Sequence, residues 1–305
     1  MGPYIARRLV WTVVTIFAIV TVTYFVAYLV PQDPARVIAG AHASAATIEG
    51  IRRALGLNKP LWQRYLIFLG QFVHGNLGYD FIQQRPVAQM VLQAAPYTAY
   101  LAVVAVFFEL LFAIPVGIIA AVKRNTFIDG LLRVLTIIGI SLPTYWVGSL
   151  MLLIFGFYLK LFPLGGVSLS GVVLPAVSVG ITGSAFYARI LRSSMLEVMR
   201  LDYIRTARAK GMPERRVLFG HTVRTALIPV VTYLGLDFGT LLGGLIITEV
   251  IFDWSGLGLL LNQGISTLDD SLIVGITLFS ATAIVVMNLL VDIAYAFIDP
   301  RVSYS

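Results

Sequence analysis

The chain has 305 residues, of which 58% are hydrophobic and 12% charged, and it contains no cysteine. Soluble domains carry about 25% charged residues, so this composition is typical of a protein whose solvent is the lipid bilayer. It excludes a cytosolic enzyme, a disordered chain and a secreted domain held together by disulfides. The formal net charge of +7 then reports on orientation in a membrane, and we expect no nucleic-acid partner.

Apolar segments along the chain predict an all-α, polytopic membrane protein. A hydrocarbon core about 30 Å thick needs roughly 20 apolar residues in a helix. We therefore predict six transmembrane helices, at residues 9–30, 97–122, 134–159, 172–188, 225–251 and 272–298. Prolines inside these segments, such as Pro143, are tolerated because neighbouring helices can satisfy the freed backbone groups.

The distribution of basic residues predicts the orientation. Nine of the 22 Lys and Arg residues lie between residues 189 and 224, whereas loops 160–171 and 252–271 together hold only Lys160. Short loops rich in Lys and Arg stay in the cytoplasm, so we expect both termini to be cytoplasmic. The segment 31–96 carries six basic residues on the outer side, but segments of roughly 60 residues translocate largely regardless of charge.

The outer segment predicts a small helical insertion. Residues 47–55 form an amphipathic helix that ends at Gly56, and Pro60 opens a second helix with one broad apolar face. Two compatible interpretations stay open: a cap over the ends of the transmembrane helices, or a docking surface for an extracytoplasmic partner. The predicted organisation is 1–30 for the N-terminal end and first helix, 31–96 for the insertion, and 97–305 for a five-helix core.

A second hydrophilic stretch, residues 195–224, predicts a cytoplasmic helical hairpin. Residues 195–210 form its first helix, Gly211 follows the helix end, and Pro213 lies in the first turn of a helix that runs through Arg224. A hairpin of this size is not stable alone and must pack on something. It either rests on anionic lipid or fits a cytosolic partner as a lever.

Six short stretches, in order along the chain, resemble one family. They are P-Q-D-P after the first segment, L-G-L-N-K-P-L-W-Q-R-Y and G-N-L-G-Y-D in the insertion, S-L-P-T-Y-W-V-G in the third segment, R-T-A-R-A-K-G in the hairpin, and E-V-I-F-D-W-S-G-L-G from Glu249 onward. The hairpin stretch resembles the E-A-A-x-x-x-G signature of permease subunits in binding-protein-dependent ABC importers. The whole set is similar to the B-type permease of the dipeptide and oligopeptide (peptide/nickel-type) importers.

This resemblance implies a type I ABC importer permease fold and half of a translocation path for di- or oligopeptides. The implied partners are a homologous second permease in a heterodimer, two cytosolic ATP-binding subunits, an extracytoplasmic substrate-binding protein and membrane lipid. The implied location is the bacterial or archaeal plasma membrane. The hairpin would be the coupling helix that contacts the ATPase, through Asp202, Tyr203, Arg205, Thr206, Ala207, Lys210, Gly211 and Met212.

Acidic residues inside the apolar segments are further candidates, because charge near the bilayer centre costs at least ~2.5 kcal/mol. Glu109 lies in the middle of its segment, Asp237 comes next, and Glu249 and Asp292 fall near segment ends. A structural ion pair or hydrogen bond and a substrate contact are both open for each, but no Lys or Arg lies within the six segments to pair with them. The candidates for the translocation path or helix packing are Glu109, Pro143, Gly235, Asp237, Gly239, Gly243 and Glu249.

The sequence lacks the motifs of several catalytic classes. Its three His residues show no metal-ligand spacing, so we expect no metal site, and the G-x-x-x-x-G-K-[ST] loop is absent. We therefore expect the chain not to be an enzyme and to bind no cofactor, with ATP and Mg held by partner subunits. Two alternatives remain: a permease for another small solute, such as a nickel chelate or glutathione, or an intramembrane enzyme that pairs Glu109 with Asp237.

Overall fold

The computed structural model describes residues 2–29, 34–40, 43–54, 56–242 and 245–298, and it is almost entirely helical. It comprises two compact units. The first unit consists of Met1–Thr98, Leu242–Ile246 and Ser255–Ser305, and the second consists of Ala99–Leu241 and Ile247–Trp254. In the described part of the chain, five helices are long and apolar enough to cross a membrane, and a sixth span results if one bent pair of helices counts as one.

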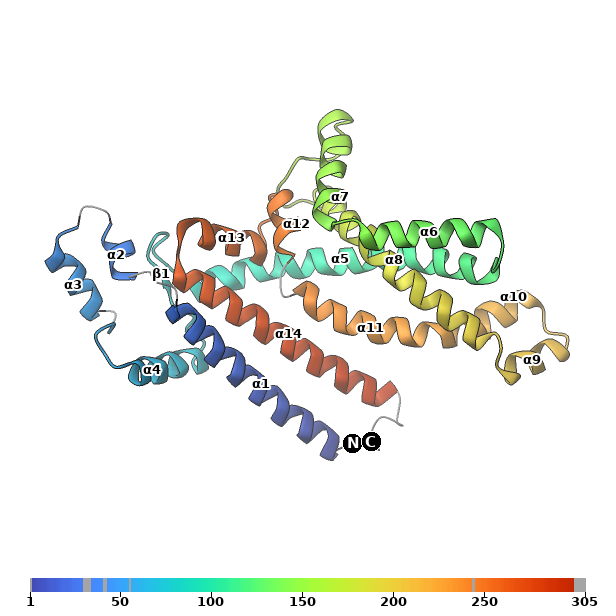
Figure 1. Cartoon of the computed structure of the whole chain (residues 1–305), viewed down its shortest axis with the longest axis horizontal. Helices are drawn as coiled ribbons and strands as arrows, with labels where there is room; N and C mark the ends of the chain where they lie inside the picture. Colours follow the sequence, from blue (N-terminus) through green and yellow to red (C-terminus); the bar gives the residue numbers. More distant parts are fainter. Residues whose placement is uncertain (1, 30–33, 41–42, 55, 243–244, 299–305) are drawn as a thin grey trace. The chain divides into compact units, whose positions relative to one another are not determined.

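Two long helices form the membrane-embedded part of the first unit. Helices α1 (Gly2–Leu29) and α14 (Asp270–Ile298) run side by side (Figure 1). Arg8 of α1 lies 2.9 Å from Asp292 of α14. The expectation that Asp292 has no cationic partner in a membrane helix was wrong, because α1 begins seven residues before the predicted segment and so includes Arg8.

The insertion predicted at 31–96 forms the helices that the sequence predicts. They are α3 (Ala45–Ala54), followed by Gly56 in the left-handed conformation (φ +66°), and α4 (Leu61–Val73), which begins after Pro60. The short helix α2 (Pro34–Ala39) and the two-stranded hairpin of β1 (Tyr79–Asp80) and β2 (Arg85–Pro86) were not predicted. Helix α4 packs on α1, where Tyr24 stacks near Tyr65 and Phe68.

The carboxyl groups of Asp80 and Asp269 join the two-stranded β1–β2 hairpin to the start of α14. Asp80 accepts hydrogen bonds from the backbone N–H groups of Ile82 and Gln83 at 2.7 and 2.9 Å, and Asp269 accepts one from Leu272 at 2.9 Å. Both acids are buried, and their side chains are hydrogen-bonded to each other. Burial, together with this bond to Asp80, raises the pKa of Asp269 to about 6.

The segment before Asp269 is helical, whereas the sequence predicts a loop there. Helix α13 (Leu257–Thr267) ends at Leu268, which has a left-handed conformation with φ +55°. The backbone N–H of Leu257, its first residue, donates a 2.8 Å hydrogen bond to the side-chain hydroxyl of Thr98. The apolar residues of α13 and α14 pack with the start of α5 (Val87–Val122), which begins ten residues before the predicted position 97.

The third predicted span is not one straight helix. Helix α6 (Phe127–Ser141) is followed by α7 (Thr144–Met151) and the π-helical segment η1 (Leu152–Tyr158), with a 97° bend between them. The bend falls at Leu142 and Pro143, both in extended conformation. The physical reason is that proline disfavours helical geometry in the residue before it and lacks an N–H of its own.

The fourth and fifth predicted spans have different ends from those observed. Helix α8 (Val173–Val198) runs ten residues past the predicted end, so the hairpin helix predicted at 195–210 is broken at 199–201. The fifth span is a continuous helical run made of α10 (Glu214–Arg216), η2 (Val217–Val223) and α11 (Arg224–Leu242). It ends well before the predicted position 251, and α12 (Ile246–Ile251) is a separate helix.

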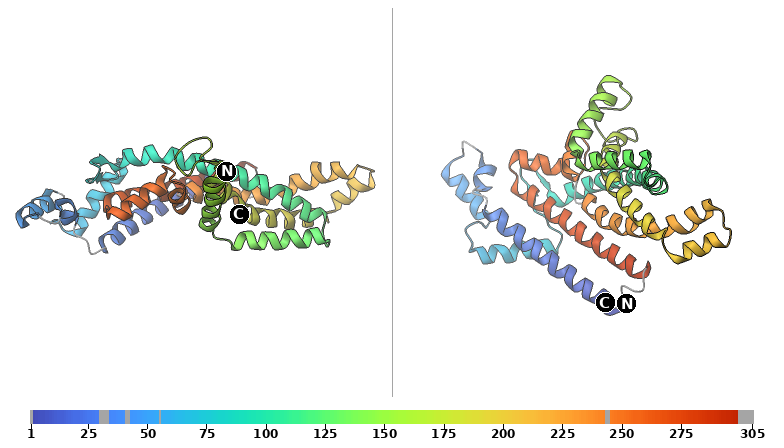
Figure 2. Two further views of the ribbon diagram at one scale, coloured as in Figure 1. Left: turned by 90° about the horizontal axis from the view of Figure 1, so that it is seen from above. Right: turned by 45° about the vertical axis from the view of Figure 1, so that its right-hand side comes forward.

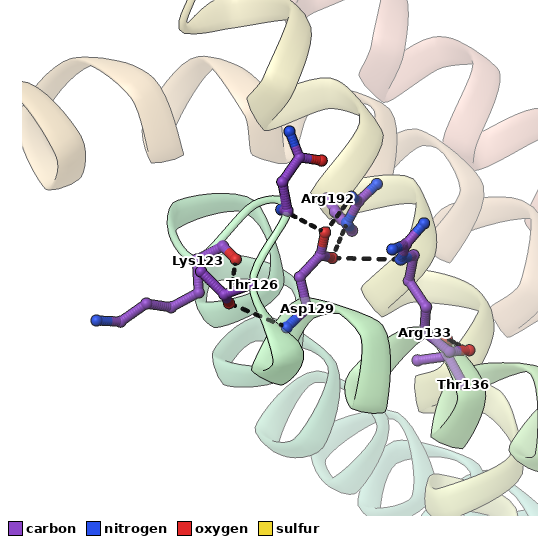
Figure 3. Close-up of polar contacts among 7 residues, drawn as sticks. Lys123, Thr126, Asp129, Arg133, Thr136 and Arg192 are labelled. Atoms are coloured by element: carbon purple, nitrogen blue, oxygen red, sulfur yellow. Dashed lines mark hydrogen bonds and ion pairs between the residues drawn. The ribbon is translucent and has the colours of Figure 1, made fainter.

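A buried ion pair fastens α6 to α8 (Figure 3). Asp129 is fully buried and accepts two hydrogen bonds from Arg192, at 2.8 and 2.9 Å. The backbone N–H of Asn125 donates a third at 3.0 Å, and Arg133 lies 3.6 Å away. The bidentate geometry satisfies both carboxylate oxygens. This clasp holds the loop before α6 against α8, the helix that leads to the hairpin predicted at 195–224.

Replacement of Asp129 by Asn is expected to destabilise the second unit by about 3 kcal/mol, because Arg192 then loses its charged partner in a largely buried position. Thermal unfolding of the purified protein in detergent measures this as a melting temperature lower by several degrees. Combining Asp129→Asn with Arg192→Gln should recover part of the loss. As a control, Glu49→Gln removes only exposed ion pairs and should have little effect. Equal melting temperatures for wild type and Asp129→Asn would contradict the clasp.

The Asp269 pair is expected to make stability depend on pH. Because the folded-state pKa of Asp269 is about 6, above its ordinary value of 3.8, the folded protein holds this proton more tightly than the unfolded chain. The resulting stabilisation is therefore present at low pH and is lost as the pH rises through 6. Thermal unfolding of wild type should show a larger fall in melting temperature from pH 5 to pH 7 than Asp269→Asn. Identical pH profiles would refute the assignment.

Candidate functional site

The hairpin predicted at 195–224 is stiffened at its tip by backbone geometry. Helix α9 spans Asp202–Ala209, Lys210 is its C-cap residue, and the next residue, Gly211, has φ +76°. The N–H of Gly211 bonds to the carbonyl of Arg208 at 2.9 Å, and the N–H of Met212 bonds to that of Ala207 at 3.3 Å. This pair of bonds is the Schellman motif, which needs a left-handed residue and so favours glycine. The prediction that Gly211 turns the chain is confirmed.

A side-chain brace closes the same turn. Arg208 donates to both carboxylate oxygens of Glu214, at 3.1 and 2.6 Å, across the loop that joins α9 to α10. Both views in Figure 2 show α9 and α10 as a hairpin at the ends of α8 and α11. This pair was not predicted, although an Arg and a Glu six residues apart across a predicted turn are a recognisable signal.

One face of the hairpin packs on its own helices, and the other is open. Ile204 and Ala207 are buried with Met195, Val217 and other residues in a hydrophobic core that continues into α8 and α11. Met212 is partly buried against the same core. The remaining predicted coupling residues are exposed, and we call them the hairpin rim: Asp202, Tyr203, Arg205, Thr206, Lys210 and Gly211.

Gly211 borders open space. A Cβ built on this glycine meets no atom within 4 Å. Its requirement for glycine within the chain is therefore conformational, and the space beside it is free for another molecule. Ala207, predicted to allow close approach of a partner, instead points into the core of the hairpin.

Two of the predicted intramembrane acids meet around one tyrosine. Tyr187 of α8 donates a 2.7 Å hydrogen bond to Asp237 of α11. The Thr240 hydroxyl donates to the backbone carbonyl of Asp237 at 2.7 Å and lies 3.2 Å from its other carboxylate oxygen. Glu109 of α5 is only 2% exposed and lies against Gly183, where a Cβ would overlap its Oε1 atom. Sequence reasoning found both acids but not Tyr187, because a tyrosine 50 residues from Asp237 carries no local signal.

Tyr187 and Asp237 border a cavity of about 410 Å³ in the second unit, and Glu109 lies behind Gly183 in its wall. The cavity is lined by Gly183, Phe186, Tyr187, Tyr233, Asp237 and Thr240. Among the described residues, no hydrogen bond joins Glu109 to Asp237, because Asp237 bonds to Tyr187 and Thr240 instead. The shared-proton geometry that the intramembrane-enzyme alternative requires is therefore not present.

The other predicted residues lie apart from this cavity. Glu249 is fully buried in α12, and Pro143 marks the bend before α7. Gly235 and Gly239 lie on α11, and Gly243 falls outside the described residues. In the part of the chain that the structure describes, no group of three His, Asp or Glu side chains has the arrangement of a metal site.

Comparison with known proteins assigns the family. Residues 113–304 match the model of the binding-protein-dependent transport system inner membrane component, and residues 1–102 match the N-terminal model of the same membrane component. The chain is 37% identical to the glutathione transport system permease protein GsiC of Escherichia coli strain K12, over the whole of both chains. It is 36% identical, again over both whole chains, to GsiC of Shigella flexneri.

A solved structure supports the fold. A chain in an inward-facing structure of the MetNI methionine ABC transporter superposes with a TM-score of 0.53 and 17% identity, covering 69% of this chain and 97% of that chain. The predicted type I permease fold is thus confirmed. The chain belongs to the family of inner-membrane components of binding-protein-dependent transport systems, and it is a multi-pass permease subunit of an ABC importer.

Proposed function

We propose that this permease forms half of the translocation path of an ATP-driven importer of short peptides, with glutathione or a peptide of similar size as the solute. The observation that carries the proposal is the full-length similarity to glutathione transport permeases at 37% identity. Glutathione is itself a tripeptide, so the predicted peptide substrate and the glutathione alternative describe one chemical class. The other half of the path would come from a homologous second permease.

We propose that the hairpin rim receives the movement of an ATP-hydrolysing subunit. Two properties support this role. The rim is exposed, with open space at Gly211, and the hairpin beneath it is held rigid by the Schellman motif and by the Arg208–Glu214 brace. A rigid element that shares one hydrophobic core with α8 and α11 transmits a displacement to those helices, whereas a flexible loop would absorb it.

The remaining parts of the assembly follow from this proposal. Two cytosolic subunits would bind ATP and Mg, and an extracytoplasmic binding protein would deliver solute on the side of α3 and α4. Both termini would be cytoplasmic, as the basic residues beside the hairpin predict. The amphipathic helices α3 and α4 contain no buried side chain among their described residues, which suits an element that contacts a partner or the bilayer surface.

The solute class is tested by reconstituting the complete importer in proteoliposomes with its binding protein. Glutathione or a dipeptide is expected to stimulate ATP hydrolysis and to accumulate in the vesicles, whereas nickel chelates should do neither. The control is the same assembly with an empty binding protein. Stimulation by a non-peptide solute alone would refute the peptide assignment and leave the family membership intact.

The lever is tested by Gly211→Val. Valine in the left-handed conformation costs roughly 1–2 kcal/mol, so the hairpin tip should distort while membrane insertion stays normal. Solute uptake is expected to fall by roughly tenfold, the effect of about 1.4 kcal/mol in coupling, while basal ATP hydrolysis continues. Uptake and ATP hydrolysis are both measured in proteoliposomes.

Gly166→Val is the matched control, because Gly166 also has positive φ (+90°) and no atom within 4 Å of a built Cβ. It lies in a loop outside the hairpin and should leave coupling unchanged. Normal uptake in Gly211→Val, or an equal loss in both variants, would count against the hairpin as the lever.

A further inference from the structure

The cavity in the second unit has an acidic and aromatic lining. Its one charged lining residue among those described is Asp237, and no Lys or Arg lines it. The Asp237 carboxylate accepts a 2.7 Å hydrogen bond from the Tyr187 hydroxyl, and the Thr240 hydroxyl lies 3.2 Å from its other oxygen while making a shorter bond of 2.7 Å to the Asp237 backbone carbonyl. Hydroxyl donors fix the position of a carboxylate but do not neutralise its charge. The cavity therefore holds a carboxyl group with no cation beside it among its described lining residues, on a helix that is long and apolar enough to cross a membrane.

Glu109 adds a second carboxyl group behind the wall of the cavity. Glu109 is only 2% exposed, and its Oε2 atom has no hydrogen-bond partner among the residues that the structure describes. Its Oε1 atom lies against Gly183, which lines the cavity. Glu109 is also close enough to Asp237 and Tyr187 to interact with both electrostatically. A buried polar atom without a hydrogen-bond partner is unfavourable, so a polar ligand group that reaches this carboxyl would satisfy it.

Two aromatic rings complete the site. Phe186 and Tyr233 line the cavity and meet edge to face, with ring centres 5.8 Å apart and an angle of 90° between planes. A cation beside an aromatic face is attracted by the negative charge of that face. Carboxylates together with aromatic rings are the combination that recognises an organic ammonium group.

We propose that this cavity binds a primary ammonium group, and that in the transported solute this group is the free amino terminus of a peptide. This assignment rests on the proposed function. The volume of about 410 Å³ accommodates a small organic solute. A bare metal ion fits less well, because the described residues offer no group of three metal-binding side chains and divalent ions require several oxygen ligands.

The test uses the absence of cysteine from the natural chain. Thr240→Cys places a single, nearly isosteric thiol beside Asp237. In the complete importer, this thiol is modified with the cationic reagent 2-aminoethyl methanethiosulfonate or the anionic 2-sulfonatoethyl reagent, and mass spectrometry of this chain measures both rates. Taking the ratio of the two rates removes any effect of the variant on the reactivity of the thiol itself.

The cationic reagent is expected to react faster, and the ratio should fall by roughly fivefold when Asp237→Asn is added, because one nearby charge is lost. Glu109→Gln should lower the ratio less. Asp292→Asn is the matched control, because Asp292 pairs with Arg8 and does not line the cavity. A ratio that Asp237→Asn leaves unchanged would overturn the proposal. So would failure of both reagents to react, because the second permease would then cover the cavity.

A second arm identifies the ligand. Glycylglycine, which has a free amino group, should protect the thiol from modification, and N-acetylglycylglycine should not. Equal protection by both peptides would overturn the assignment. If glycylglycine does not protect the thiol although the wild-type importer takes up peptides normally, the site is refuted and the proposed function stands. Protection by glycylglycine without any peptide uptake would refute the proposed function and leave a site for another primary amine.

Discussion

One hydrophobic core joins the hairpin to the long apolar helices of the second unit. It includes Ile204 and Val217 in the hairpin, Met195 and Tyr187 on α8, and Val230 on α11. Cores are packed as densely as organic crystals, so a displacement at one end cannot be absorbed by free volume. Tyr187 belongs to this core and also donates to Asp237 at the edge of the cavity. The hairpin and the cavity are therefore mechanically connected through one helix.

The acidic groups of the second unit illustrate two solutions to the cost of burying charge. The charge of Asp129 is neutralised by the bidentate hydrogen bonds of Arg192, and this ion pair holds α6 against α8. Asp237 and Glu109 receive no such cation from the described residues around them. Because charge in a membrane is expensive, acids kept without a counter-ion indicate a role other than packing. The difference between the two groups is visible only in three dimensions.

The sequence predicted the local features well. Gly56, Gly211 and Pro60 ended or began helices as expected, because a left-handed residue or a proline acts on its immediate neighbours. The bend at Pro143 was misjudged, since the same proline can be accommodated in a helix or can break it, and packing decides. The Asp129–Arg192 clasp and the Tyr187–Asp237 bond link residues 63 and 50 positions apart. A single sequence has no local pattern that pairs residues so far apart along the chain.

The central claim is that the hairpin rim is a contact surface for an ATP-hydrolysing subunit and relays its motion to α8 and α11. An experimental map of the complete importer in its membrane environment tests this most directly. The account predicts that Tyr203, Arg205 and Lys210 are buried against a cytosolic subunit, with Gly211 in close approach to its backbone. A map in which these residues contact only lipid headgroups would contradict it.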